Sequence, residues 1–345
     1  MRAVVFAGPG SVRVDEVAEP RIQADTDVVV SVSATSICGS DLHVLDGKTP
    51  GMREGGVIGH EFVGEVHDAG DGSGFTAGER VLGSFLIACG ECKACIARRF
   101  NFCERRRALG LGTLTGDLDG AQAERVRIPL APVNAKRIPS GLDDDRALFA
   151  GDILTTGFYG VEVAEISAED VVVVFGAGPV GLFTAQAAVL RAARVLILDA
   201  DPRRVAFARD LGLEALDVSE IAPEAEVAGA TEGAMADVAV DAVGVVPVVK
   251  SALRCVRDGG RIAVLGVYGQ ERWELPMGVA WIRGIDLRFS GMANVQAHWD
   301  ATLDAVQAGS IDPTRLITHR LPLEGAEEGY ELFRSREAMK VVLTP

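Results

Sequence analysis

The sequence predicts an α/β protein in which a mostly β domain is joined to a doubly wound parallel sheet. Three observations lead to this prediction. The continuous apolar run Val171–Phe175 is typical of a strand buried on both faces. Strands alternate with helices after it, and the N-terminal part contains short apolar segments bounded by glycine. A chain of 345 residues can form about two domains. We expect the β domain at residues 1–153 and 290–345, and the parallel sheet at residues 154–289.

The β domain is expected to contain strands wherever valine-rich or alternating segments are bounded by glycine and proline. These segments are residues 1–6, 27–37, 61–67, 80–86 and 124–128. In the C-terminal part we expect helices at residues 298–306 and 325–333, and strands at residues 316–321 and 340–343.

In the parallel sheet, a glycine turn and an Ala/Leu-rich helix that reaches about residue 190 are expected after the first strand. Further strands are expected at residues 195–198, 238–241 and 261–265, with helices at residues 203–211 and between the last two strands. Residues 222–236 are rich in Ala, Glu and Gly, so we expect a loose surface stretch there.

The net charge of the chain argues against nucleic acids and anionic membranes as partners. Lys and Arg number 34 against 49 Asp and Glu, which gives a formal net charge of −15. Such a chain repels phosphate backbones and anionic membranes. No apolar run approaches the roughly 20 residues of a membrane-spanning helix, and the N-terminus reads as a strand rather than a signal peptide. We therefore expect a cytoplasmic protein that acts on a small molecule, without nucleic-acid or membrane partners.

Four cysteines within fifteen residues are the most informative motif. Cys89, Cys92, Cys95 and Cys103 can complete a tetrahedral shell around one zinc ion, with no position left for a substrate. The alternative is two disulfides. Because the chain has six cysteines and no secretory signal, a reducing compartment and metal binding are favoured. The motif predicts a structural zinc site and makes a second, open zinc site worth seeking.

A glycine-rich turn predicts a dinucleotide site. Gly176, Gly178 and Gly181 follow the buried strand and open a helix, so Gly176 can form the tight turn, Gly178 can admit a pyrophosphate and Gly181 can pack helix on strand. The helix N-terminus, which includes Pro179 and Val180, offers N–H groups to the phosphates. The alternative is a tight turn without a ligand.

Asp199 lies 23 residues after Gly176, where an acid can accept hydrogen bonds from the adenosine ribose. Its charge would repel a 2′-phosphate, so NAD is favoured over NADP. The alternatives are an ordinary surface acid and, because Arg203 and Arg204 lie close by, a less exclusive choice of cofactor.

Cys38, His60 and Asp152 are candidates for the open zinc site, although each alone could be a buried cysteine, a core histidine or a capping aspartate. Taken together, these segments resemble the zinc-dependent medium-chain alcohol dehydrogenases over essentially the whole chain. The resemblance rests on Gly59-His60-Glu61, the four-cysteine lobe and the glycine turn, in the family's order. Residues 120–124, 147–154 and 316–323 resemble most the formaldehyde dehydrogenase-like branch.

The resemblance implies a GroES-like catalytic domain, a Rossmann NAD-binding domain and a role for each matching residue. Cys38, His60 and Asp152 match the ligands of a catalytic zinc whose fourth position holds water or substrate. Glu61 matches a residue that ligates this zinc transiently. The remaining matches are Asp41, which orients His60; Ser40 and His43, the proton relay; Phe85, the pocket wall; and Thr156, Arg204 and Lys340 at the cofactor.

The implied function is zinc-dependent hydride transfer between an alcohol or hydrated aldehyde and NAD, with two zinc ions per chain. The alternatives are a polyol or sugar-alcohol dehydrogenase and a non-catalytic protein that binds zinc and dinucleotide. The family resemblance also implies a homodimer or homotetramer. The apolar residues Phe85, Leu86, Leu109 and Leu111 are expected to favour an unbranched or aromatic alcohol over a polyol.

Overall fold

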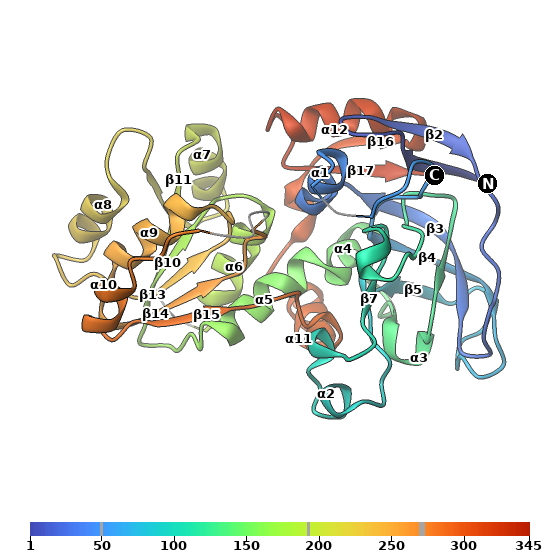
Figure 1. Ribbon diagram of the computed structural model, residues 1–345, viewed down its shortest axis with the longest axis horizontal. Helices are drawn as coiled ribbons and strands as arrows, with labels where there is room; N and C mark the ends of the chain where they lie inside the picture. Colours follow the sequence, from blue (N-terminus) through green and yellow to red (C-terminus); the bar gives the residue numbers. More distant parts are fainter. Residues whose placement is uncertain (49–50, 192–193, 269–272) are drawn as a thin grey trace. The chain divides into compact units, whose positions relative to one another are not determined.

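The computed structural model describes residues 1–345 except 49–50, 192–193 and 269–272, and it divides into two compact units (Figure 1). Unit 1 comprises Met1–Thr155 and Met292–Pro345, and unit 2 comprises Thr156–Gly291. The predicted α/β architecture, with a mostly β part and a parallel sheet, is confirmed. Among the described residues, no helix has the length and apolar character that crossing a membrane requires.

Unit 1 is built on a seven-stranded sheet in the order β16-β17-β3-β4-β5-β9, with β8 paired to β3. These strands are β3 (Val28–Ser36), β4 (Glu61–Ala69), β5 (Arg80–Gly83), β8 (Arg125–Ile128), β9 (Ala135–Arg137), β16 (Ile317–Pro322) and β17 (Lys340–Thr344). Two small antiparallel sheets pair β1 (Arg2–Phe6) with β2 (Val12–Glu16), and β6 (Leu86–Ile87) with β7 (Arg107–Ala108). Their β-branched and aromatic residues form the buried cores.

The helices of unit 1 are short, apart from two near the C-terminus. They are α1 (Gly39–Leu45), α2 (Lys93–Ile96), α3 (Ala131–Asn134), α4 (Asp144–Leu148), α11 (Val295–Gln307) and α12 (Ala326–Arg334). The helix α5 (Ile153–Val163) begins in unit 1 and continues into unit 2.

Unit 2 is a six-stranded parallel sheet in the order β12-β11-β10-β13-β14-β15, with helices as crossovers (Figure 1). Its strands are β10 (Val171–Phe175), β11 (Arg194–Asp199), β12 (Glu214–Asp217), β13 (Ala236–Asp241), β14 (Val256–Val264) and β15 (Asp286–Phe289). Its helices are α6 (Pro179–Val189), α7 (Pro202–Asp210), α8 (Pro223–Ala230), α9 (Val246–Cys255) and α10 (Met277–Ile282). The strand order reverses at β10, so the loop after β10 lies at the switch point where such sheets bind ligands.

The prediction of a loose stretch at residues 222–236 is wrong, because α8 forms there. Pro223 occupies the first turn, where its missing N–H is not needed. The Val227 side chain is fully buried in the core of unit 2, and the Glu224 carboxylate lies 2.8 Å from the Arg254 guanidinium. One buried valine is too weak a periodic signal to reveal this helix in the sequence.

Candidate active site

The register of two strands brings the first two candidate ligands together. Ser36 at the end of β3 pairs with Glu61 at the start of β4. Cys38 lies two residues beyond Ser36, and His60 lies one residue before Glu61. Both residues therefore lie at the same end of the β3–β4 strand pair. Gly59 has φ +86°, and the Gln122 side chain occupies the place of a β-carbon there, so only glycine fits.

Asp152 completes a buried three-residue cluster. His60 Nε2 lies 3.2 Å and Cys38 Sγ 3.6 Å from Asp152 Oδ2, and the three donor atoms lie within 4.8 Å of one another. The three residues are 7%, 1% and 8% exposed in the order Cys38, His60, Asp152. Sulfur, imidazole nitrogen and carboxylate oxygen are the ligands that zinc takes in proteins. The structure therefore brings together the three residues predicted to hold the catalytic zinc.

The charges at this cluster fit a bound cation. Burial raises the pKa of the Cys38 thiol, and the neighbouring Glu61 and Asp152 carboxylates raise it further. Burial alone would lower the pKa of His60, but Asp41 and Asp152 outweigh it and raise that pKa well above 6.5. Several acidic groups thus converge in a largely buried region, which is costly unless positive charge compensates them. A divalent ion would supply that charge.

The Asp41 carboxylate lies beside the His60 ring. His60 Nδ1 lies 3.0 Å from Asp41 Oδ1, and the Cys38 backbone N–H donates to Asp41 Oδ2 at 2.9 Å. A carboxylate beside Nδ1 keeps the proton there and leaves the Nε2 lone pair for a metal. The position of Asp41 fits the role that the family resemblance implies, and the role itself stays a prediction.

Lys340 forms a buried ion pair beside the candidate metal site. Its side chain is fully buried, and its ammonium group donates to the Ile37 carbonyl at 2.8 Å and forms an ion pair with Glu61. Burial opposes the ammonium charge, but Glu61 offsets this and the pKa of Lys340 is raised. A buried lysine needs a counter-charge, and Glu61 supplies it here. The contact of Lys340 with a cofactor phosphate stays a prediction. Glu61 also accepts a hydrogen bond from Ser36.

The predicted relay residues lie on α1. Ser40 Oγ is 3.1 Å from His60 Nε2, so its hydroxyl lies beside the candidate metal ligands. His43 is three residues later on the same helix and partly buried. Burial lowers the pKa of His43, and Lys48 lowers it further. The Phe85 ring stands edge-on to the His60 ring at 5.9 Å.

The other apolar residues expected in the pocket wall are packed in cores. Leu86 and Leu109 are at most 1% exposed. Leu109 belongs to the cluster around Phe62, and Leu111 packs on the cluster around Tyr330. Phe85, in contrast, contacts the ring of the candidate ligand His60.

Gly151 and Thr155 support the backbone beside Asp152. A β-carbon on Gly151 would lie 2.6 Å from the Gly83 carbonyl oxygen, so the close approach of β5 requires glycine. Thr155 is fully buried, and its hydroxyl donates to the Asp152 carbonyl at 2.6 Å. Both contacts help to fix the backbone that carries the Asp152 carboxylate.

The four-cysteine lobe surrounds α2 and projects from unit 1 (Figure 1). All six cysteines of the chain are free thiols, and one donor atom from each of the four lies within 4.8 Å of the others. Backbone N–H groups point at sulfur: Cys92 N at 3.4 Å from Cys89 Sγ, and Cys89 N at 3.3 Å from Cys103 Sγ. Burial raises the pKa of Cys89, but the N–H groups of Glu91 and Cys92 outweigh it and bring the pKa to about 6. Four sulfurs so arranged fit a closed zinc shell.

The glycine turn has the geometry that its sequence predicts. Gly176 has φ +96°, and a β-carbon there would lie 2.6 Å from Val243. A β-carbon on Gly181 would collide with the Gly176 carbonyl oxygen, so helix α6 packs tightly on β10. Gly178 precedes α6 and is more open, with an Arg204 nitrogen 3.6 Å from its β-carbon position. Pro179 and Val180 form the first turn of α6.

Asp199 closes this turn from the end of β11. Its Oδ2 accepts from the Ala177 N–H at 2.7 Å, and its Oδ1 accepts from the Asp201 N–H at 2.8 Å. The Arg204 guanidinium lies 4.0 Å from Asp199 Oδ2, whereas Arg203 is held by the Asp201 carboxylate at 3.0 Å. The two arginines therefore differ: Arg204 lies over the glycine turn, and Arg203 is tied to Asp201. Thr156 is the first residue of unit 2, on α5, and partly buried.

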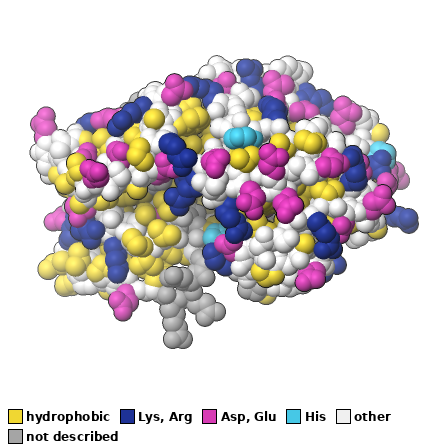
Figure 2. Space-filling view, turned by 90° about the horizontal axis from the view of Figure 1, so that it is seen from above, with side chains coloured by type: hydrophobic (Ala, Val, Ile, Leu, Met, Phe, Trp, Pro, Cys, Tyr) yellow, Lys and Arg dark blue, Asp and Glu magenta, His cyan; other side chains and the backbone are white. Residues whose placement is uncertain are grey.

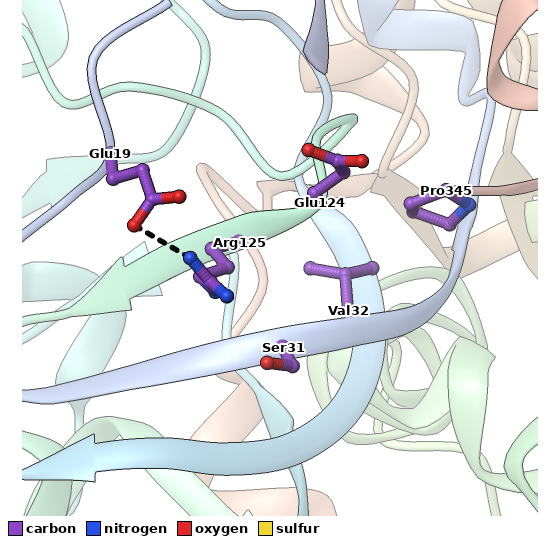
Figure 3. Close-up of a pocket in the computed structure, with 6 residues that line it drawn as sticks. All are labelled: Glu19, Ser31, Val32, Glu124, Arg125 and Pro345. Carbon is purple, nitrogen blue, oxygen red and sulfur yellow. Dashed lines mark ion pairs between the residues drawn. The ribbon is translucent and has the colours of Figure 1, made fainter. Parts of the chain in front are cut away.

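Two open surface pockets lie outside the candidate metal site. The smaller, of about 270 Å³, contains the Glu19–Arg125 ion pair (Figure 3). The larger, of about 500 Å³, lies beyond β12 and includes Arg209 and Asp217. Neither holds a residue predicted to act in catalysis. On the face seen in Figure 2, acidic and basic side chains are interspersed.

Sequence reasoning missed two residues beside the candidate metal site. Gln122 is fully buried, and its side-chain nitrogen lies 3.4 Å from Asp41 Oδ2. Its oxygen accepts a hydrogen bond from Tyr330, which is 2% exposed. The polar Gln122 between Ala121 and Ala123 was the one available signal. Tyr330 gave none, because its partner is 208 residues away.

Comparison with known families matches both parts of the chain. Residues 24–137 match the alcohol dehydrogenase GroES-like domain, and residues 179–308 match the zinc-binding dehydrogenase domain. The zinc-type alcohol dehydrogenase-like protein AdhB of Bacillus subtilis (strain 168) is 33% identical, with 100% of each chain covered. The sorbitol dehydrogenase of Halalkalibacterium halodurans is 30% identical, with 100% of this chain and 99% of the relative covered.

Solved structures show the same fold over the whole chain. The alcohol dehydrogenase TADH from Thermus sp. ATN1 is 40% identical, with a TM-score of 0.97 and 100% of both chains covered. Two further structures cover 100% of this chain and 99% of their own with a TM-score of 0.87. One is a zinc-binding dehydrogenase from Sinorhizobium meliloti 1021 bound to NADP, 29% identical. The other is an alcohol dehydrogenase from E. coli CFT073 complexed with NADH, 27% identical.

Proposed function

Because this chain belongs to the zinc-containing medium-chain alcohol dehydrogenase family, we propose that it transfers hydride between an alcohol or hydrated aldehyde and NAD. The observation that carries the proposal is the buried convergence of Cys38 Sγ, His60 Nε2 and the Asp152 carboxylate. We propose these residues as ligands of a catalytic zinc, with Glu61 as a transient ligand. The four-cysteine cluster is proposed to hold a second, structural zinc.

Zinc held by three protein ligands supplies a Lewis acid that lowers the pKa of a substrate hydroxyl. The residues around the zinc ligands are proposed to hold the His60 proton and to transfer the substrate proton. Asp41, whose Oδ1 lies 3.0 Å from His60 Nδ1, is proposed to keep the His60 proton on that nitrogen. The Ser40 hydroxyl lies beside the ligands and is proposed to receive the substrate proton. His43, with its lowered pKa, is mainly a neutral base at pH 7 and is proposed to pass that proton to water.

One screen tests the reaction class. The zinc content of the purified protein is measured, and the protein is tested for NAD reduction with primary alcohols, secondary alcohols, polyols and hydrated aldehydes. Turnover of primary alcohols or hydrated aldehydes supports the proposal. A strong preference for polyols would favour the second candidate, a polyol dehydrogenase, which the 30% identity to a sorbitol dehydrogenase supports. One zinc ion per chain and no turnover would point to a non-catalytic protein.

The proton relay predicts a pH effect with a definite sign. Burial lowers the pKa of His43 first, and Lys48 lowers it further. Replacing Lys48→Met removes a positive charge while Asp46 keeps its ion pair with Arg334, and the loss of the lysine charge raises the pKa of His43. Since the relay needs neutral His43, the acidic limb of kcat/KM for alcohol oxidation should move to higher pH.

A pH series of kcat/KM measures this shift. Lys136→Met is the matched control, because it also removes a lysine paired with an aspartate, Asp300, on unit 1. An acidic limb that stays in place in Lys48→Met, or moves to lower pH, would exclude His43 from the relay.

We propose NAD as the preferred cofactor, with Asp199 as the main determinant. Asp199→Gly should lower the ratio of kcat/KM for NAD over NADP by at least about tenfold, or roughly 1.4 kcal/mol. The arginine expected to meet the 2′-phosphate is Arg204, which lies near Asp199. Arg203 stays tied to Asp201, so it contributes when Asp201→Asn is added.

Asp199 also holds the Ala177 N–H, so a matched variant must separate charge from loop geometry. Asp199→Asn keeps an acceptor oxygen and removes the charge. It should shift the ratio in the same direction, and the shift should vanish when Arg204→Met is added. A wild-type protein that prefers NADP would overturn the assignment of Asp199.

We propose a homodimer or homotetramer that uses an apolar face of unit 2. On α10, Met277, Trp281 and Ile282 are 64%, 81% and 76% exposed, and Phe289 on the edge strand β15 is 58% exposed. Such residues in one region mark an interaction surface. Sedimentation velocity should show an oligomer for the wild type and a smaller species for Trp281→Glu. A wild type that sediments as a monomer would contradict the proposal.

A further inference from the structure

A buried chain of polar side chains leads away from the proposed catalytic zinc site. Asp41 Oδ1 lies 3.0 Å from His60 Nδ1. The Gln122 side-chain nitrogen lies 3.4 Å from Asp41 Oδ2 and 3.3 Å from the Ser36 carbonyl oxygen. The Tyr330 hydroxyl donates to Gln122 Oε1 at 3.0 Å. Asp41 and Gln122 are fully buried and Tyr330 is 2% exposed, so water does not compete with these contacts.

The direction of each hydrogen bond follows from the donors available. An amide side chain donates through nitrogen and accepts through oxygen, and its two ends are otherwise similar in shape. Tyr330 presents its hydroxyl proton to one end of Gln122, while the other end faces the Ser36 carbonyl and the Asp41 carboxylate, both acceptors. The two acceptors therefore require the amide to direct its NH₂ group towards Asp41, which leaves its oxygen to accept from the Tyr330 hydroxyl.

The surrounding backbone is shaped around this chain of contacts. The Gln122 side chain occupies the space beside Gly59, the residue before His60, where a β-carbon would collide with it. Tyr330 lies in the apolar core that also contains Ile37 and Val341. An apolar residue would fill the same space without the cost of burying polar groups. Two buried polar residues that end on the Asp41–His60 pair therefore point to a role at the metal site.

We propose that Gln122 and Tyr330 are positioning residues that hold the Asp41 carboxylate against His60 and thereby strengthen zinc binding by Cys38, His60 and Asp152; this rests on the proposed function. Outer contacts of this kind orient a ligating histidine, and losing one typically weakens metal binding by about 10–100-fold. Gln122 constrains Asp41 directly, and Tyr330 acts through Gln122.

The test is chelator competition on the full chain loaded with two zinc ions. Tyr330→Phe keeps the ring and removes the hydroxyl, and Gln122→Met keeps the size and removes the amide. Each should weaken the catalytic zinc by at least about tenfold and leave the four-cysteine zinc in place. With Co²⁺ as a probe in the catalytic site, the visible absorption bands should shift in both variants, because the His60 ligand is altered.

Tyr159→Phe is the matched control. Tyr159 is 6% exposed, and its hydroxyl donates to the Ser290 carbonyl at 3.1 Å within unit 2. Tyr159→Phe therefore also removes a buried tyrosine hydroxyl, but not one in the Gln122–Asp41 chain of contacts. Its zinc affinity and Co²⁺ spectrum should equal those of the wild type. If Tyr330→Phe and Gln122→Met match Tyr159→Phe in both measurements, the positioning role is refuted. A wild type that binds zinc only at the four cysteines would instead refute the proposed function.

Discussion

Replacing Cys38→Ser should abolish turnover while leaving NAD binding nearly unchanged. Cys38 supplies the one sulfur of the three-residue cluster, and serine is a much poorer zinc ligand. Losing the Lewis acid costs several kcal/mol of barrier. A loss of about 4 kcal/mol corresponds to roughly a thousandfold fall in kcat. The glycine turn lies in unit 2, so the NAD dissociation constant should change little.

Steady-state kinetics, metal content and fluorescence titration with NADH measure these effects. Cys255→Ala is the matched control, because Cys255 is fully buried and burial raises the pKa of its thiol to about 12. That variant should keep two zinc ions and its turnover. Full activity in Cys38→Ser would show that the cluster is not the active site.

The second large effect is expected for Cys95→Ser, which should lose stability rather than intrinsic chemistry. Cys95 is 4% exposed and its sulfur lies 3.5 Å from Cys92 Sγ, inside the proposed structural zinc shell. A structural zinc contributes folding free energy directly. If about 4 kcal/mol is lost, the melting temperature should fall by roughly 8–16 °C.

Calorimetry and activity at low temperature separate the two effects. Residual kcat at low temperature should stay close to that of the wild type, and one zinc ion per chain should be missing. A melting temperature unchanged after loss of that zinc would contradict a stabilising role. Cys255→Ala again controls for removal of a buried thiol.

Local patterns in the sequence predicted the parts of the fold that depend on neighbouring residues. The run Val171–Phe175 forms β10 with the predicted bounds. The cysteine spacing predicted a compact cluster, and the glycine turn predicted the tight backbone at Gly176. These signals are reliable because burial, turn geometry and metal ligation act over short stretches of chain.

Contacts between distant segments could not be predicted in the same way. Lys340 meets Glu61 across 279 residues, so this ion pair depends on how β17 packs beside β3. The Gln122–Tyr330 contact depends likewise on how α12 packs. No periodicity encodes such pairings. The formaldehyde dehydrogenase-like branch also remains a prediction, because the relatives establish the wider family.

The division of labour between the two units has a consequence for how such an enzyme can change. The proposed metal ligands lie in residues 1–155, whereas the glycine turn and Asp199 lie in residues 156–291. The chain crosses between units at Thr155–Thr156 and Gly291–Met292. Recombination at those two junctions would exchange one unit and leave the sequence of the other unit unchanged. Cofactor choice and substrate chemistry can therefore evolve as separate traits, each under its own selection.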